Sequence, residues 1–304
     1  MPRVKAYVRW QAERRGRSGA GRPAPVPDFA PVSINLDLTT ACNFACDHCV
    51  DKQILNQPIR FDHDRLCDAL RLLADRGLKS VIVIGGGEPT LYKHFVETIR
   101  LMKRLGLAVA IVSNGSGMAR IREVADCLEA VDWVRLSLDA GTDATFQAMH
   151  KPRKRVTLEE VCAAVPEIKV LNRAFPVGFS FVITWKGATI HEADIVENLT
   201  EIVPAAALAR DSRFDYIALK PFLTRARTNN AEIVDLRDTD RHFADVIARI
   251  RAEVDRARAL ERADFKVYET TNLKVLENRS YRNYTRQPRQ CHMQFFRQVL
   301  SPLG

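Results

Sequence analysis

The sequence predicts an α/β fold built on a parallel sheet. Strand-like and helix-like segments alternate six times between residues 32 and 262. Most predicted strands are short apolar runs, as expected for strands that are buried on both faces of a sheet. Strands that alternate with helices at this spacing form parallel sheets with helical crossovers, either as an open doubly wound sheet or as a partial barrel.

The first strand–helix unit shows both patterns clearly. Residues 32–38 (VSINLDL) alternate apolar and polar side chains, which is typical of a strand. Residues 62–76 place Leu66 and Leu70 on one helical face, and the pattern stops at Gly77. We therefore expect a strand followed by a helix.

Five further units follow with the same features. Their strands are predicted at residues 81–84, 107–112, 133–138, 177–184 and 214–219. Their helices are predicted at residues 94–105, 121–130, 157–171, 193–203 and 243–262. Pro166 is expected to kink or split its helix, because proline removes a helical hydrogen bond. Residues 265–276 are expected to add a strand or a hairpin.

Composition is that of an ordinary globular protein. Of 304 residues, 46% are hydrophobic and 27% are charged. No apolar run approaches the roughly 20 residues of a membrane-spanning helix, and the N-terminus lacks the apolar core of a signal peptide. We therefore expect a cytoplasmic protein with no membrane partner.

The net charge of +9 is concentrated at the N-terminus. Residues 1–27 contain seven Arg or Lys residues and one acid, Glu13, and they are rich in Gly and Pro. Residues 1–30 are therefore predicted to be a disordered basic arm, either a solvated tail or a segment that binds an acidic partner. The rest of the chain is not basic enough to predict nucleic-acid binding.

The chain contains seven cysteines, an odd number that argues against a disulfide framework. Cys42, Cys46 and Cys49 fall within eight residues, with the spacing C-x3-C-x2-C, soon after the first predicted strand. Thiolates suit iron–sulfur clusters, and three of them leave one iron of a four-iron cubane open to a small molecule. Zinc with His48 as a fourth ligand, and three metal-free buried thiols, are the alternatives.

This motif, at the end of the first strand of a β/α series, resembles the signature of the radical S-adenosylmethionine (SAM) superfamily. In that family the residue before the third cysteine is usually aromatic and packs near the adenine; here it is His48. Residues 85–89 (GGGEP) follow the second predicted strand and match the family's Gly-Gly-Glu-Pro motif. Glycines let a backbone approach a ligand closely, and the resemblance implies that Glu88 accepts hydrogen bonds from the methionine ammonium of SAM.

Two more strand ends fit the resemblance. Residues 113–115 (SNG) stand where the family often has Thr-Asn-Gly, and residues 137–139 (SLD) stand where a Ser-x-Asp pattern commonly faces the ribose and carboxylate of SAM. β/α folds bind ligands at these carboxyl ends of their strands. The expected cofactor-binding residues are His48, Gly86, Gly87, Glu88, Pro89, Asn114, Ser137 and Asp139. The expected metal ligands are Cys42, Cys46 and Cys49.

The resemblance also implies an architecture and a chemistry. The fold would be a partial (β/α)6 TIM-like barrel over residues 31–262. The cysteines would bind a [4Fe–4S] cluster, and the amino and carboxylate groups of SAM would chelate its open iron. One electron, from a flavodoxin- or ferredoxin-type donor, would then release a 5′-deoxyadenosyl radical that abstracts hydrogen from a substrate.

The residues after position 262 do not continue the alternation of strands and helices. Residues 291–304 begin with Cys291 and end at Gly304, and they resemble the opening of a SPASM or twitch extension, which binds auxiliary iron–sulfur clusters. The chain stops before any further cysteine, so residues 263–304 are expected to be a linker and an incomplete extension of a truncated or decayed kind. A free thiol at Cys291 is the alternative. Three other cysteines, Cys67, Cys127 and Cys162, are expected to act as small hydrophobic residues in helices.

The expected function is radical chemistry of the SPASM/twitch-like branch on a peptide or protein side chain. A small polar metabolite such as a sugar or nucleoside is the second substrate class. The competing class is a non-catalytic β/α protein that binds zinc or senses redox state. No catalytic acid or base is predicted, and His150, Lys151 and Arg153 are expected to form a solvated turn rather than to contact an anionic substrate. Lys220 and Arg225 are candidate contacts of the substrate or SAM.

Overall fold

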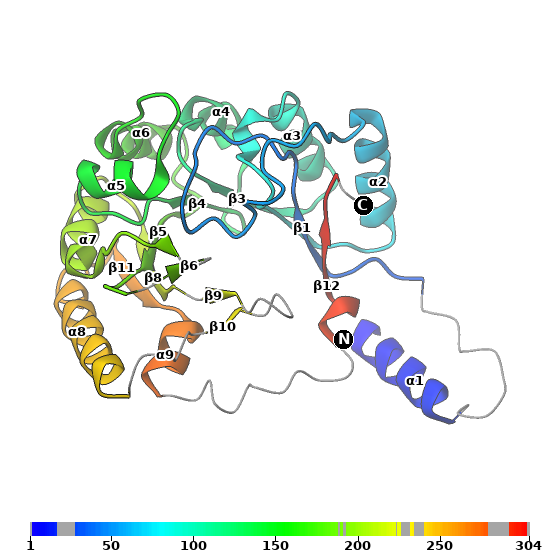
Figure 1. Cartoon of the computed structure of the whole chain (residues 1–304). Helices are drawn as coiled ribbons and strands as arrows, with labels where there is room; N and C mark the ends of the chain where they lie inside the picture. The colour runs from blue at the N-terminus through cyan, green and yellow to red at the C-terminus, as the bar shows by residue number, and fades with distance from the viewer. Residues whose placement is uncertain are drawn as a thin grey trace.

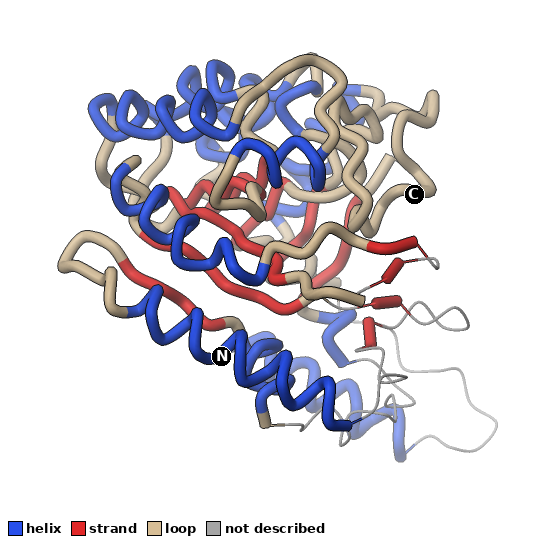
Figure 2. The backbone as a smooth tube through the Cα atoms, turned by 60° about the vertical axis from the view of Figure 1, so that its left-hand side comes forward, coloured by secondary structure: helices blue, strands red, loops and turns tan. Residues whose placement is uncertain are grey.

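The computed structural model describes residues 2–16, 28–187, 189–190, 193–222, 224–225, 232–233, 240–278 and 292–302. Eight parallel strands form one curved sheet in the order β11-β8-β5-β4-β3-β2-β1-β12. Helices line its outer side, as Figure 1 and Figure 2 show. In the described part of the chain β11 and β12 are the two edges of this sheet, so the structure is a partial TIM-like barrel.

The strands of the main sheet are β1 (Ser33–Leu36), β2 (Ser80–Val83), β3 (Ala108–Ser113), β4 (Trp133–Ser137), β5 (Val177–Ile183), β8 (Tyr216–Pro221), β11 (Lys266–Glu269) and β12 (Arg297–Leu300). The helices are α1 (Pro2–Gly16), α2 (His63–Asp75), α3 (Phe95–Arg104), α4 (Met118–Val124), α5 (Asp143–His150), α6 (Leu158–Leu171), α7 (Ile202–Asp211), α8 (Asp240–Arg258) and α9 (Thr271–Glu277). Two-residue strands pair as β6 (Thr189–Ile190) with β7 (Ala193–Asp194) and as β9 (Thr224–Arg225) with β10 (Glu232–Ile233).

The six strands predicted from the sequence are confirmed as β1, β2, β3, β4, β5 and β8. Their apolar side chains are buried, and Val83, Ile111 and Leu136 are fully enclosed. On the outer side, Leu70 of α2 and Ile99 of α3 are buried against the sheet. Each such side chain stabilises the fold by about 1.5–3 kcal/mol relative to exposure.

The helix prediction at residues 193–203 is wrong for its first part. Residues 193–194 form β7, and α7 begins only at Ile202. The side chain of Asn198 holds the intervening segment to the strand ends, because its amide donates to Asp139 O (2.7 Å) and its oxygen accepts from Thr184 N (2.8 Å). These contacts compete with helix formation.

Two other local predictions offered alternatives. Residues 265–276, predicted as a strand or a hairpin, form strand β11 and then helix α9, so the strand is confirmed and the hairpin is wrong. Pro166 lies inside α6 without splitting it, since one helix runs from Leu158 to Leu171.

The N-terminal segment is helical over Pro2–Gly16, where the composition predicts a disordered arm. The rings of Tyr7 and Trp10 contact Phe295, with ring centroids 4.8 and 6.2 Å apart. The positive charge and the Gly and Pro content of the N-terminal residues predicted disorder and gave no sign of this aromatic contact. The contact gives helix α1 a surface to pack on. Residues 17–27 of the expected arm lie outside the described residues.

The C-terminal strand β12 completes the sheet beside β1. It pairs with β1 in parallel from Ser33 with Arg297 to Leu36 with Leu300. Cys291, which was expected to open a SPASM or twitch extension, lies outside the described residues. No helix in the described ranges is long and apolar enough to cross a membrane.

Candidate functional site

The three clustered cysteines lie in the loop that follows β1, at the carboxyl end of the sheet. Each of their side chains is partly buried. Burial raises the pKa of the Cys46 thiol well above its usual value, and the nearby thiols of Cys49 and Cys42 raise it further. Burial also raises the pKa of Cys49, to which Asp51 and the Cys42 thiol add. The structure therefore brings the three sulfurs into one electrostatic environment.

This donor set fits an iron–sulfur cluster. Burial raises the pKa of Cys42 as well, so all three thiolates are disfavoured in the protein alone. A bound cationic metal reverses that balance, because a coordinated thiol is deprotonated outright. Among the described residues, the compact His/Asp group formed by His48, Asp139 and His150 lies beside these thiols.

The glycine-rich loop after β2 packs against the chain that leads into Cys42. Gly87 N donates to Thr39 O, and Glu88 N donates to Ala41 O at 2.8 Å. A Cβ atom on Gly87 would lie 2.0 Å from Ala41 O. The close approach that these glycines allow is therefore to the cysteine-loop backbone.

Asp37, at the end of β1, lies under this loop and was not singled out from the sequence. A Cβ atom on Gly85, whose φ is +95°, would come within 2.5 Å of the Asp37 carboxylate. Burial and the charge of Asp51 raise the pKa of Asp37 to about 6. An isolated Asp in a strand gives no sequence signal of such burial.

Glu88 is buried, and both of its carboxylate oxygens accept hydrogen bonds from the protein. Oε1 accepts from Thr90 N (3.0 Å), Thr90 Oγ1 (2.6 Å) and Ser113 Oγ (2.8 Å). Oε2 accepts from Asn114 N at 2.7 Å. Burial raises the pKa of Glu88, and these hydrogen bonds lower it in part. Glu88 thus joins the loop after β2 to the loop after β3.

Asn114 extends this connection to the cysteine loop. Its Nδ2 donates to Asn43 Oδ1 at 3.1 Å, and Asn43 Nδ2 donates to Ser116 Oγ at 2.9 Å. Asn43 follows Cys42 directly. The loops after β1, β2 and β3 therefore form one hydrogen-bonded unit. Pro89, which opens a short 3₁₀ turn, is buried beside it.

Asp139 and His48 connect the segment after β4 to the cysteine loop. Asp139 follows β4 with φ of +53°, an uncommon conformation for a residue with a side chain. Its Oδ2 lies 3.1 Å from His48 Nε2, and its Oδ1 accepts from Val182 N at 2.7 Å. Burial alone would raise the pKa of Asp139, but the hydrogen bond and charge of His48 hold it below its usual value. Ser137 ends β4 and is half-buried.

His48 has one buried nitrogen without a protein partner. Nε2 faces the Asp139 carboxylate, whereas Nδ1 is buried and has no hydrogen-bond partner among the described residues. Buried polar atoms are rarely left in this state. This orphaned atom beside the cysteines fits a site that takes a further group.

His150 is a site residue that the sequence interpretation placed in a solvated turn. It is 2% exposed, and its Nδ1 lies 3.2 Å from Cys46 Sγ. Burial lowers its pKa to about 4. Because 104 residues separate His150 from Cys46, no local pattern could have joined them.

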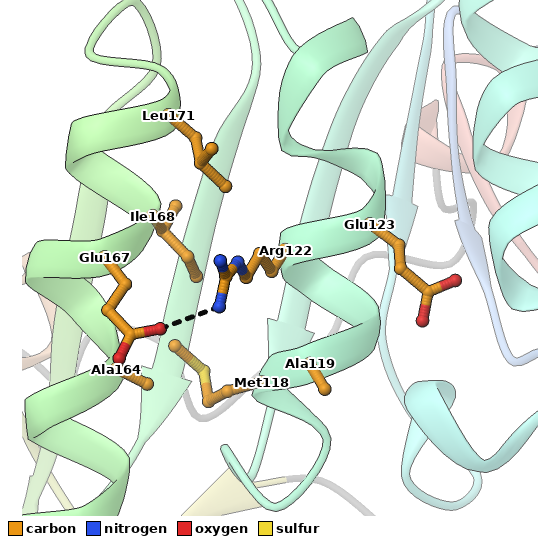
Figure 3. Close-up of a pocket in the computed structure, with 8 residues that line it drawn as sticks. All are labelled: Met118, Ala119, Arg122, Glu123, Ala164, Glu167, Ile168 and Leu171. Atoms are coloured by element: carbon orange, nitrogen blue, oxygen red, sulfur yellow. Dashed lines mark hydrogen bonds and ion pairs between the residues drawn. The ribbon is translucent and has the colours of Figure 1, made fainter.

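A separate pocket between α4 and α6 contains none of these residues. Figure 3 shows its lining, which the Arg122–Glu167 ion pair (2.9 Å) crosses. It lies between two outer helices, so it is not the site built at the strand ends.

Comparisons with known proteins agree with this geometry. The family model described as "Radical SAM superfamily" matches residues 36–199. An S-adenosylmethionine-dependent nucleotide dehydratase of Thermoplasmatales archaeon (strain ISO4-H5) is 35% identical over 117 residues, 37% of this chain and 39% of that relative. One from Flammeovirga pacifica is 22% identical over 222 residues, 71% of each chain.

The fold is also that of a solved structure. Streptococcus suis SuiB, crystallised with its precursor peptide SuiA, superimposes with a TM-score of 0.64 at 12% identity, covering 98% of this chain and 61% of SuiB. The chain thus spans well under half of the first relative and about three-fifths of SuiB. With over half of its residues matched by the family model, this chain belongs to the radical SAM superfamily.

Proposed function

We propose that this chain holds a [4Fe–4S] cluster through Cys42, Cys46 and Cys49 and cleaves SAM reductively to start hydrogen abstraction from a substrate. One observation carries the proposal: three partly buried thiols lie in one loop, at the strand end where the loops after β2, β3 and β4 meet it. When bound, the cluster and SAM supply one-electron bond cleavage and hydrogen abstraction from a C–H bond.

The chain's own residues position these groups. The three thiolates would hold three irons of the cluster and would leave the fourth iron open to SAM. Gly86 and Gly87 let the loop after β2 press against the cysteine loop, since a Cβ on either would meet backbone atoms of Thr39 or Ala41. The buried carboxylate of Glu88 holds these loops together, and the ammonium contact with SAM that the family resemblance implies for it stays part of the proposal.

The remaining expected SAM contacts stand as part of the proposal. Asn114, Ser137 and Asp139 lie at or just after the ends of β3 and β4, and His48 presents an unpartnered buried nitrogen. Pro89 shapes the turn after Glu88. A flavodoxin- or ferredoxin-type protein is the proposed electron donor.

A peptide or protein side chain is the first proposed substrate class. Its support is the likeness of fold to SuiB, which was crystallised with a precursor peptide. A nucleotide, a small polar metabolite, is the second, because two relatives by sequence are named nucleotide dehydratases. A C-terminal SPASM or twitch extension beginning at Cys291 would belong with the first class.

The test begins with anaerobic reconstitution, followed by dithionite reduction in the presence of SAM. We expect about four irons per chain and formation of 5′-deoxyadenosine. Nucleoside triphosphates and short peptides are then added in parallel, and the class that accelerates 5′-deoxyadenosine formation identifies the substrate. A colourless zinc protein that leaves SAM intact would support the non-catalytic alternative instead.

A further inference from the structure

The two faces of the main sheet carry different side chains. In β4 the fully buried residues Val134 and Leu136 alternate with partly buried ones, which are Trp133, Arg135 and Ser137. Successive side chains of a strand point to opposite faces. Because helices line the outer side of the sheet (Figure 2), the fully buried set faces the helices and the partly buried set faces the inner side. Strand β4 thus places Arg135 on the inner face.

Arg135 has no acidic partner in the described part of the chain. Its Nε atom is buried and has no hydrogen-bond partner there. Its guanidinium lies over the ring of Trp133, with Cζ 5.2 Å from the ring centroid. A ring face attracts the cation but leaves the five N–H donors of a guanidinium available. Since buried N–H groups are rarely left unpaired, Arg135 is suited to bind a group that the described residues do not supply.

The neighbours of Arg135 on the inner face are small or uncharged. Its register partners are Val112 of β3 on one side and Gly178 of β5 on the other. Ser137, two residues further along β4, pairs with Ser180 of β5. None of these four residues is acidic, so they do not offset the positive charge. A cation that is partly withdrawn from water attracts an anion more strongly than a fully solvated one.

Gly178 lets a second hydrogen-bond donor approach Arg135. Tyr216 of β8 is the register partner of Gly178, and its ring lies over this glycine. A Cβ atom on Gly178 would lie 2.1 Å from Tyr216 Cζ and 2.4 Å from Tyr216 Oη. Burial raises the pKa of Tyr216, and the positive charge of Arg135 lowers it in part. The phenol and the guanidinium therefore lie within electrostatic reach of each other, beside the space that a side chain at position 178 would fill.

A further cation lies on the same face, closer to the cysteine loop. Lys220 is exposed and stands four residues after Tyr216, so both side chains belong to one face of β8. Its register partner is Val182 of β5, whose N–H donates to Asp139 Oδ1 at 2.7 Å. The inner face thus carries positive charge both in the middle of the sheet and at the strand ends where the site is built.

We propose that Arg135 binds an oxyanion of the substrate, a phosphate or a carboxylate group, on the inner face of the sheet, with the Tyr216 hydroxyl as a second donor. The guanidinium fork matches both groups in a bidentate manner. The inference rests on the proposed function in one respect, namely that the oxyanion belongs to the molecule from which hydrogen is abstracted. Arg135 lies two residues before the end of β4, about 7 Å along the strand. A substrate held there by its oxyanion extends toward the cysteine loop.

Three substitutions separate anion binding from packing. Arg135→Met keeps an unbranched side chain that can cover Trp133, but it removes the charge and the donors. Arg135→Lys keeps the charge and loses the fork. Arg122→Met is the matched control, because it makes the same change on an outer helix, where Arg122 is exposed and pairs with Glu167.

The measurement is the dissociation constant of two probes, inorganic tripolyphosphate and glutarate, determined by calorimetry at matched ionic strength on each anaerobically reconstituted full chain. We expect at least one probe to bind the wild type. Arg135→Met should weaken that probe by about tenfold or more, because it removes charge-assisted hydrogen bonds. Arg135→Lys should weaken it by about threefold, and Arg122→Met should stay within about twofold of wild type. The tighter probe identifies the oxyanion as phosphate or carboxylate.

The urea midpoint gives a second readout. If Arg135 binds a ligand, Arg135→Met should unfold at the same or a higher urea concentration than wild type. The reason is that this variant removes a partly buried charge without a partner among the described residues. If Arg135 only packs on Trp133, the variant should unfold at a lower urea concentration and bind both probes as wild type does, which overturns the inference.

The remaining outcomes are also distinct. A wild type that binds neither probe overturns the inference, and so does equal weakening by Arg135→Met and Arg122→Met. In both cases the proposed function stands if the chain holds about four irons and forms 5′-deoxyadenosine. A chain that takes up no cluster overturns the proposed function itself, and the same two probes then judge the oxyanion site on the metal-free chain. Should Arg135→Met not fold, as judged by circular dichroism, Arg135→Lys carries the test.

Discussion

The backbone N–H of Asn114 donates to Oε2 of Glu88 over 2.7 Å, while the backbone N–H of Thr90 donates to Oε1 over 3.0 Å. Each carboxylate oxygen therefore faces a backbone N–H group, which can donate a hydrogen bond but cannot accept one. The hydroxyls of Thr90 and Ser113 add donors to Oε1, but a hydroxyl can also rotate and accept. This arrangement makes the negative charge of Glu88 part of the framework of the site.

Glu88→Gln should consequently destabilise the folded chain even without SAM. In either orientation the amide NH₂ would meet a backbone N–H donor, leaving buried donors unpaired at a cost of about 1–3 kcal/mol. Urea unfolding of the metal-free protein measures this, with Glu159→Gln as an exposed control. Unchanged unfolding together with weaker SAM binding would instead favour the direct ammonium contact that the family resemblance implies.

Gly87→Ala should prevent cluster retention. The added Cβ would lie 2.0 Å from Ala41 O and 2.5 Å from Ala41 C, so the chain entering Cys42 must shift. Iron content after reconstitution should fall to less than half that of wild type. Gly106→Ala is the control, because it has no atom within 4 Å of a new Cβ and meets only the strain of its φ of +71°. Equal iron content in the two variants would contradict a role for this close contact.

The Cys42, Cys46 and Cys49 triple Ala variant should lose both iron and SAM cleavage. The remaining described cysteines stand apart in helical segments: Cys67, Cys127 and Cys162. Cys67→Ala is therefore a control that should keep about four irons per chain. A triple variant that still assembled the full iron content would show that the cluster is held elsewhere.

Asp37→Asn should stabilise the chain near neutral pH. The folded-state pKa of Asp37, raised to about 6 from 3.8, means that the folded state binds the proton more tightly than the unfolded state. Stability linked to this group is present below pH 4 and declines as the pH rises toward 6. The urea midpoint of the variant should thus exceed that of wild type at pH 7.5, and the difference should shrink at pH 4.5. A difference that does not change with pH would show that burial and the charge of Asp51 do not raise the pKa of Asp37.

Local patterns predicted most of the fold because each strand and helix carries its own periodicity. The stripe of α2 and the apolar run of β3 are readable within a dozen residues. Helix α1 and strand β12 were missed because their stability comes from distant partners. Tyr7 of α1 contacts Phe295, and residues 297–300 of β12 pair with β1. Neither contact can be recognised from a short stretch of sequence.

The site divides in the same way. Spacing alone indicated the cysteines, because the three proposed ligands of one metal group lie in one loop. The role of Glu88 in the framework could not be seen from its motif, since its partners include Ser113 and Asn114 on the next strand end. His150 belongs to no sequence motif. Its contact with Cys46 depends on where the end of α5 lies in the folded protein, which the sequence around His150 does not show.

The pairing of β12 with β1 also sets an order of events during synthesis. Strand β1 gains β2 once Val83 has been made, but its other neighbour starts at Arg297. At 5–20 residues per second this interval lasts about 10–40 s. Throughout it, the strand that leads into the cysteine loop exposes an unpaired edge, a site for wrong pairing. Iron loading into a loop whose preceding strand is paired on both sides would therefore have to wait until β12 has left the ribosome.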